Sequence, residues 1–271
     1  ERMMILRRWS FDGQQIYAPW QFTPAASEQR WIDEHPRLKV VIYDAFLPLS
    51  FFDDQGTLKG LIVDLLSNIS THTGLDFETV SVRTLAQGIE MVKSGKADVL
   101  GIVTSSVAWG NQLSFTRPYL TTPFVLISRI GPDSPQTLDE MAGRRVVMVR
   151  GNVLRDFIVH NYPQVQILEA DNPPAALAMV AEGRADAAIT ALVSARYLVS
   201  RRFEHQLRIT STVGTQPEQI GFATAGNDHQ LNSILDKALL NITPGELSDL
   251  TARWLTDTPD LGSYWLRNRR V

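Results

Sequence analysis

Two short stretches of the sequence carry hydrogen-bond donors of the kind that hold a small anion. Arg150 and Asn152 lie in the turn "RGNV", directly before a segment that predicts a helix ending at Asn161. Free N–H groups and the dipole at the start of a helix favour a carboxylate or a sulfate. Thr104 and Ser105 add two hydroxyl groups after a short apolar run. We interpret these residues as candidate ligand contacts, the alternative being that Asn152 only caps its helix.

Aromatic side chains could form a wall of the same site. Trp109 is the first candidate, Phe46 and Tyr119 are further ones, and Thr190 adds a hydroxyl at the end of another apolar run. Small-molecule sites combine aromatic walls with a few polar groups in this way. The alternative for Trp109 is that its ring only packs against its neighbours.

No catalytic or metal-binding arrangement is evident in the sequence. Cysteine is absent, which excludes thiolate catalysis and zinc–thiolate sites. No Gly-x-Ser-x-Gly motif is present, and the adjacent Asp53 and Asp54 lie in "DDQG", a predicted turn where acids are solvated. The five histidines are scattered without metal-ligand spacing (His35, His72, His160, His205 and His229). We expect no enzyme activity, no metal and no cofactor.

Length and composition indicate a globular protein of two lobes. The chain has 271 residues, 44% apolar and 20% charged, which is long for one simple core. A formal net charge of -3 provides no electrostatic basis for binding nucleic acid. No window of about eighteen apolar residues predicts a membrane span. The chain start lacks the apolar stretch of a secretory leader, so we expect a piece of a longer chain.

One short unit occurs twice. "MVKSGKADVLGI" begins at Met91 and "MVAEGRADAAIT" begins at Met179, 88 positions later. Apolar residues at helical spacing precede each Gly, so Gly95 and Gly183 fit the left-handed residue that ends a helix. An apolar run typical of a buried parallel strand follows. The repeat predicts two similar lobes, although any α/β protein has several helix-to-strand junctions with Gly.

Predicted strands and helices alternate along the chain. This order predicts an α/β fold in which each lobe is a mainly parallel sheet flanked by helices. The predicted strands span 38–43, 77–82, 99–103, 145–149, 165–169 and 187–189, and the predicted helices span 28–34, 61–72, 84–93, 152–161 and 173–181. We expect the chain to cross between lobes at about 123–129 and 212–222. Ligands of such sheets bind at the carboxyl ends of the strands.

The two ends of the chain are alike. An Arg-Trp pair ends at Trp9 and another at Trp254, and each is followed eleven residues later by a second Trp. We interpret residues 1–36 as the end of a preceding module and a linker, in which Ser27 caps a short helix that Pro36 stops. The alternative is chance similarity.

From Leu38 to Trp254 the sequence resembles the type 2 periplasmic solute-binding proteins, which have the Venus flytrap fold. The resemblance is carried by "PLSFFDDQGTLKGLIVDLL", "SGKADVLGIVTSS", "LSFTRPYL", "TLDEMAGRRVVMVRGN", "EGRADAAIT" and "ITPGELSDLTARW". The junction "SEQRWIDEHPRLKV" resembles the linker between tandem flytraps in BvgS-type virulence sensor histidine kinases. The resemblance implies their second, membrane-proximal flytrap, with lobe 1 over 37–126 and 218–256, lobe 2 over 127–217, and a membrane-directed segment over 257–271.

The ligand anchors of the amino acid binders in this family are missing. The Arg that holds the ligand carboxylate aligns with Trp109, the Asp that holds the ammonium aligns with Ala191, and an aromatic residue aligns with Leu49. Each charge-assisted bond is worth about 1.5–3 kcal/mol. An α-amino acid is therefore not the expected ligand, and a small organic anion is.

Three classes of function follow from the resemblance. The favoured one is the periplasmic sensory domain of an inner-membrane two-component virulence sensor histidine kinase, whose lobe opening and closing controls kinase output. Its implied partners are a neighbouring flytrap of the same chain, a second copy in a full-length homodimer, and the membrane through a downstream span. The alternatives are a free solute-binding protein of an ABC transporter and a dehydratase, which would need an acid in the cleft that Ala191 does not supply.

Overall fold

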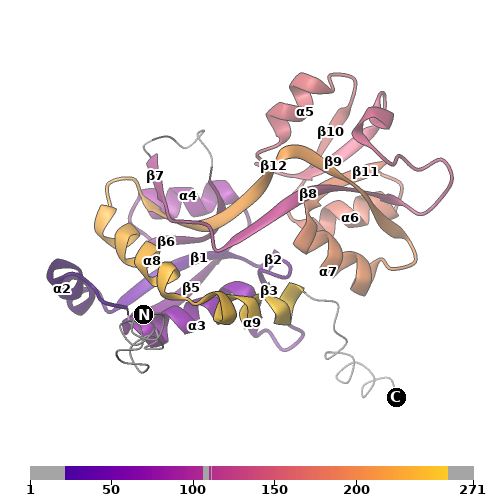
Figure 1. Cartoon of the computed structure of the whole chain (residues 1–271). Helices are drawn as coiled ribbons and strands as arrows, with labels where there is room; N and C mark the ends of the chain where they lie inside the picture. The colour runs from indigo at the N-terminus through magenta and orange to yellow at the C-terminus, as the bar shows by residue number, and fades with distance from the viewer. Residues whose placement is uncertain (1–21, 106–109, 111, 256–271) are drawn as a thin grey trace, which may run out of the picture.

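Two long strands join the lobes of the protein. The computed structural model describes residues 22–105, 110 and 112–255, and it has two α/β lobes side by side (Figure 1). Strands β8 (Leu120–Arg129) and β12 (Leu207–Ala225) run antiparallel to each other from one lobe into the other. Because both lobes share these two strands, one sheet is continuous in the order β10-β9-β11-β8-β12-β6-β1-β5.

The first lobe has a parallel core of three strands flanked by helices. Its strands are β1 (Arg37–Tyr43), β5 (Asp76–Val82) and β6 (Val99–Thr104), and β7 (Leu113–Phe115) pairs with β12. Its helices are α2 (Ala26–Glu34), α3 (Leu61–Thr73), α4 (Leu85–Lys93), α8 (His229–Asn241) and α9 (Pro244–Leu255). A small antiparallel sheet, called here the hairpin sheet, consists of β2 (Ala45–Phe46), β3 (Ser50–Phe52) and β4 (Leu58–Lys59).

The second lobe repeats this plan. Its parallel strands are β9 (Arg145–Val149), β10 (Gln166–Ala170) and β11 (Ala187–Ala191), and β11 pairs antiparallel with β8. Its helices are α5 (Arg155–Asn161), α6 (Pro173–Ala181) and α7 (Leu192–Arg202), with a short 3-10 turn, η2 (Leu138–Met141). The predicted alternation of strands and helices is confirmed in both lobes.

Two predicted helix starts are wrong. The first helix begins at Ala26 rather than after Ser27, and the Glu28 carboxylate accepts the N–H of Ala25. The helix predicted over 152–161 begins at Arg155, because Asn152 Oδ1 accepts the N–H of Leu154 and forms a local turn before the helix. Glu28 also binds Lys237 and Ser233 of α8, which fastens α2 to the first lobe.

The strand β8 changes its pairing partners near the expected crossing between the lobes. Its first residues pair with β12 as far as Thr122, and the register then shifts before Phe124. Phe124 and Val125 pair with β11 and belong to hydrophobic clusters of the second lobe. We therefore propose that the second lobe begins at about residue 124 rather than 127.

The repeated sequence unit has the same backbone geometry in each lobe. Gly95 has a φ of 71° and Gly183 a φ of 76°, the left-handed conformation that glycine adopts without strain. The two N–H groups after each Gly donate to one helical carbonyl, that of Met91 in the first lobe and that of Met179 in the second. Both units therefore turn the chain from a helix into a buried strand, as predicted.

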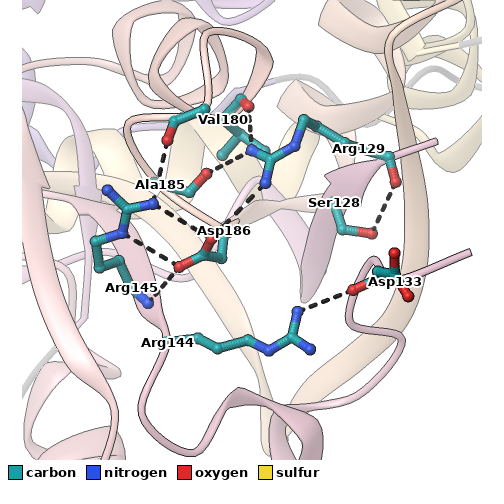
Figure 2. A network of polar contacts seen from close by, with 9 residues as sticks. Ser128, Arg129, Asp133, Arg144, Arg145, Val180, Ala185 and Asp186 are labelled. Atoms are coloured by element: carbon teal, nitrogen blue, oxygen red, sulfur yellow. Dashed lines mark hydrogen bonds and ion pairs between the residues drawn. The ribbon is translucent and has the colours of Figure 1, made fainter. Parts of the chain in front are cut away.

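The aspartate of each unit ties that strand to the first strand of its lobe. The Asp98 carboxylate accepts the N–H of Lys39 at 2.7 Å, and the Asp186 carboxylate accepts the N–H of Arg145 at 2.8 Å. Figure 2 shows that Asp186 also binds the side chains of Arg145 and Arg129, at 3.2 and 3.7 Å. Burial alone would raise the pKa of Asp186, but these hydrogen bonds and charges outweigh burial and lower it.

The sequence matches at the chain ends lie largely outside the described residues. Segments 1–21 and 256–271, which include Trp9, Trp20 and Trp265, are among them. Trp254 lies in α9, where its indole N–H donates to Asp64 of α3 at 2.9 Å. This tryptophan therefore packs within its own lobe.

Candidate functional site

A cavity of about 100 Å³ lies between the two lobes. The first lobe lines it with residues that follow β1, β5 and β6, and the second lobe with residues that follow β9 and β10. The cavity therefore lies at the carboxyl ends of parallel strands, where the sequence predicted a ligand site. Gly151 and Leu85 bring the lobes together at one side, because a methyl group added to Gly151 would lie 3.5 Å from Leu85 Cδ2.

Four of the predicted contact residues line this cavity. They are Phe46 and Thr104 from the first lobe and Arg150 and Asn152 from the second. Arg150 pairs with Glu169 at 3.4 Å and with Asp171 at 3.8 Å, so its charge is already compensated. Asn152 uses its side-chain oxygen within its own turn, and α5 is only 7 residues long. The anion site predicted at the start of this helix is therefore weaker than the sequence indicated.

Three predicted contact residues lie elsewhere. Tyr119 is 5% exposed, and its hydroxyl donates to the carbonyl of Gly101 inside the first lobe. Thr190 is 3% exposed within β11, and Ser105 is exposed without lining the cavity. None of the three lines this cavity: Tyr119 lies in the bend just before β8 and Thr190 lies within β11, and both side chains are buried in the lobes. Trp109 lies outside the described residues.

The two positions Ala191 and Leu49, where the sequence lacks expected ligand contacts, do not line the cavity. Ala191 is 3% exposed at the start of α7, and Leu49 is fully buried in the first-lobe core. Apolar side chains at both positions pack in the lobes instead of reaching a ligand. The cavity therefore keeps neither of these two family contacts.

A buried acid, Glu218, is the main feature of the cavity that the sequence did not predict. Glu218 lies in β12 next to the register shift at the crossing, and its side chain lines the cavity while the residue is only 8% exposed. Thr104 Oγ1 donates to Glu218 Oε1 at 2.6 Å. The inference that the cleft holds no acid, drawn from Ala191, is wrong, because the acid comes from the crossing strand.

Burial raises the pKa of Glu218 to about 7. The hydrogen bond from Thr104 acts in the opposite direction and offsets only part of the effect of burial. No Lys, Arg or His pairs with this carboxyl group among the described residues. Glu218 therefore changes its charge near neutral pH, in a cavity that both lobes line.

Tyr43 and Arg83 were also missed by the sequence reasoning. The Tyr43 hydroxyl is buried at the end of β1 and has no hydrogen-bond partner within the described part of the chain. The Arg83 side chain lines the cavity from the segment between β5 and α4, and no acid pairs with it in that same part.

The described residues hold no group of three or more His, Cys, Asp or Glu that could bind a metal. Within residues 22–105, 110 and 112–255, no helix has the length and apolar character needed to cross a membrane.

Two α/β lobes joined by a pair of crossing strands, with a cavity between them, define a solute-binding protein of the Venus flytrap type. The chain belongs to the bacterial extracellular solute-binding proteins, family 3, whose sequence model matches residues 38–257.

Sensor proteins are among its relatives. The virulence sensor protein BvgS of Bordetella pertussis is 37% identical over 247 residues, covering 91% of this chain and 20% of BvgS. The sensor protein EvgS of Escherichia coli K12 is 28% identical over 254 residues, covering 94% of this chain and 21% of EvgS. This chain thus spans about a fifth of the length of these relatives.

A solved domain of BvgS has the same fold. The crystal structure of the periplasmic VFT2 domain of Bordetella pertussis BvgS matches with a TM-score of 0.81 and 37% identity, over 86% of this chain and 99% of that domain. The match is therefore to a periplasmic flytrap domain of a sensor, and the resemblance seen in the sequence is confirmed.

Proposed function

We propose that this chain is the membrane-proximal sensory flytrap of a two-component virulence sensor histidine kinase, and that movement of its lobes controls kinase output. Its similarity to a whole BvgS flytrap domain supports this role. The kinase reaction would be carried out by another part of the same protein. We place the domain in the periplasm, beside another flytrap, in a homodimer anchored in the inner membrane.

The observation that carries the proposal is the position of Phe51 in the hairpin sheet. Its ring centroid lies 6.1 Å from that of Tyr197 in α7 of the second lobe. The same ring lies 5.8 Å from Trp254 in α9, the last helix that the structure describes. A rotation of the second lobe would therefore act on α9 through one side chain, and α9 leads to the C-terminal segment.

Direct contacts between the lobes favour a resting state that is closed or nearly so. Leu47 of the first lobe belongs to the hydrophobic cluster of the second lobe and is 5% exposed. Val193 of α7 packs in the opposite direction, against the first-lobe cluster. These apolar contacts hold the lobes together without a ligand, so a ligand would modulate a default state through its differential affinity.

Within this role, a small organic anion is the proposed modulator. Arg83 supports it, because this residue lines the cavity and has no acidic partner among the described residues. Arg150 is less suited, since Glu169 and Asp171 already share its charge.

The proposal is tested by replacing Phe51 with Ala in the full-length sensor and measuring autophosphorylation in membranes. We expect a changed basal output without any ligand, because the contact between α7 and α9 is lost. Phe52→Ala is the matched control, since Phe52 is the next residue of β3 and is 45% exposed. Equal basal outputs for wild type, Phe51→Ala and Phe52→Ala would contradict the proposal.

A further inference from the structure

Helix α2 is held on the first lobe by a buried acid, Glu28, which is 5% exposed. Lys237 Nζ donates to both carboxylate oxygens of Glu28, at 2.7 and 2.8 Å. The Ser233 hydroxyl and the Ala25 N–H donate to the same carboxylate at 2.9 and 2.7 Å. Burial alone would raise the pKa of Glu28, but these hydrogen bonds and the charge of Lys237 outweigh burial and lower the pKa. The acid is therefore ionised at neutral pH and pairs with Lys237.

The partners of α2 lie on one face of α8. Gln230, Ser233 and Lys237 follow one another at intervals of three and four residues, which is the spacing of neighbours on a helix surface. Gln230 Nε2 donates to the Ser27 carbonyl of α2 at 2.8 Å. Ile32 of α2 adds an apolar contact, because its side chain belongs to the hydrophobic core of the first lobe. Several groups at once therefore dock α2, in contrast to a single exposed ion pair.

This docking contact involves a segment that lies outside the family match. The match covers residues 38–257, so it includes α8 and α9 and begins after α2. Among the described residues that line the cavity, none belongs to α2, α8 or α9. An ionised group is buried only where pairing offsets its loss of hydration, so Glu28 has a specific place on α8. Its role is therefore separate from holding a solute in the cleft.

The helix that binds α2 leads directly into α9. Helix α8 ends at Asn241 and α9 begins at Pro244, so only Ile242 and Thr243 separate them (Figure 1). Thr243 Oγ1 accepts the Glu246 N–H at 3.2 Å, and Glu246 Oε2 accepts the Thr243 N–H at 2.8 Å, which is a capping box. Ile242 is 8% exposed in the first-lobe core. The start of α9 is therefore fixed to the end of α8, so a displacement of α8 would reach α9.

We propose that the contact between α2 and α8 is a second input to α9, through which the position of the segment before α2 reaches this last described helix without passing through the cleft. The inference goes beyond the proposed lobe movement, and it rests on the proposed place of this domain beside another flytrap of the same chain. The partner that acts on this surface is thus a further domain of the chain, attached through α2. Helix α9 receives both inputs, because α8 fixes its start and Phe51 couples Trp254 to the second lobe.

The first experiment is amide hydrogen exchange of the 271-residue chain with Glu28→Ala. This variant leaves Lys237 without its acid, so we expect exchange to become about 10-fold faster in α2 and about 3-fold faster in α9. Gln230→Ala removes one hydrogen bond and should act in the same direction more weakly. Glu34→Ala, at an exposed acid of α2, is the matched control and should change neither helix. Faster exchange confined to α2 would overturn the proposal, because Glu28 would then hold only its own helix.

The second experiment measures autophosphorylation of the full-length sensor in membranes with Glu28→Ala, with Phe51→Ala and with both. We expect each substitution to change basal output. The two fold-changes should multiply to within about twofold in the double variant, because independent effects add as free energies. A double variant with the output of Phe51→Ala alone would show a single shared route and would contradict the second input.

The two proposals can fail separately. An unchanged output of Glu28→Ala beside a changed output of Phe51→Ala overturns the second input and leaves the sensory role standing. Hydrogen exchange in α9 does not depend on kinase activity, so the exchange result tests the connection from α2 to α9 whatever the output of the Phe51→Ala variant.

Discussion

The rings of Trp254 and Phe51 meet edge-on, with centroids 5.8 Å apart and planes at 83°. This geometry is a favoured one for aromatic pairs. It joins the last described helix to a hairpin sheet that also touches the second lobe through Tyr197. The pair holds its position because Asp64 accepts hydrogen bonds from Trp254 Nε1 and Arg253 Nη1, each at 2.9 Å.

Replacing Asp64 with Ala should loosen α9 from the first lobe. Both hydrogen bonds to α3 are lost, which should raise the rate of amide hydrogen exchange in α9 about 10-fold, as expected for a loss of about 1.4 kcal/mol. Asp249→Ala is the control, because Asp249 is an exposed helical residue of α9. If exchange in α9 is equally slow in both variants, Asp64 does not hold this helix.

The two aspartates of the repeated unit should differ in their effect on stability. Asp186→Ala removes the backbone contact to Arg145 and leaves Arg145 and Arg129 without their acidic partner, so we expect a loss of about 2–3 kcal/mol in the free energy of unfolding. Asp98→Ala removes the contact to the Lys39 N–H and should lower the free energy of unfolding by about 1 kcal/mol. Urea denaturation of both variants near neutral pH measures the difference.

The effect of Asp186→Ala should also depend on pH. The pKa of Asp186 in the folded protein lies below its ordinary value of 3.8. Its contribution to the free energy of unfolding is therefore present above pH 3.8 and is lost as the pH falls through the pKa of the folded protein. Wild type and variant should therefore become more alike in strong acid. A stability difference that stays constant through this range would show that the charge of Asp186 is unimportant.

Glu218 should have the opposite pH dependence. The pKa of Glu218 in the folded protein, about 7, lies above the ordinary value of 4.5. Its contribution to the free energy of unfolding is therefore fully present below pH 4.5 and is lost as the pH rises through about 7. Glu218→Gln, which keeps an acceptor for Thr104, should therefore be more stable than wild type by up to about 3 kcal/mol at about pH 8 and nearly equal to it at about pH 4.5.

This difference is measured by urea denaturation of Glu218→Gln, wild type and Glu78→Gln at the two pH values. The Glu78 variant controls for the loss of an exposed acid. A Glu218→Gln effect that is the same at both pH values would mean that this carboxyl group does not titrate in the range given by its burial.

The lobes and the cleft could be predicted from the sequence because their signals are local. Helix-ending glycines such as Gly95 and Gly183 act on the backbone next to them, and apolar runs mark buried strands wherever they lie. The helix start at Asn152 was misplaced by three residues, because a side chain that caps a helix and one that forms a turn just before it have the same sequence pattern.

The site residues were only partly predictable. Thr104, Phe46, Arg150 and Asn152 follow predicted strands and line the cavity, whereas Tyr119 and Thr190 are buried in the lobes. Position next to a strand end does not determine which way a side chain points, because neighbouring residues of a strand face opposite sides of the sheet.

By itself, the sequence determined the two-lobed α/β architecture and the crossing strands, since each depends on residues close together in the chain. Only the tertiary structure decided which groups meet in the cleft and between the lobes. Thr104 and Glu218 are 114 positions apart and share a hydrogen bond, and Phe51 touches helices from both lobes. Such contacts arise where the crossing strands bring the two lobes together, and no local pattern in the chain encodes that meeting.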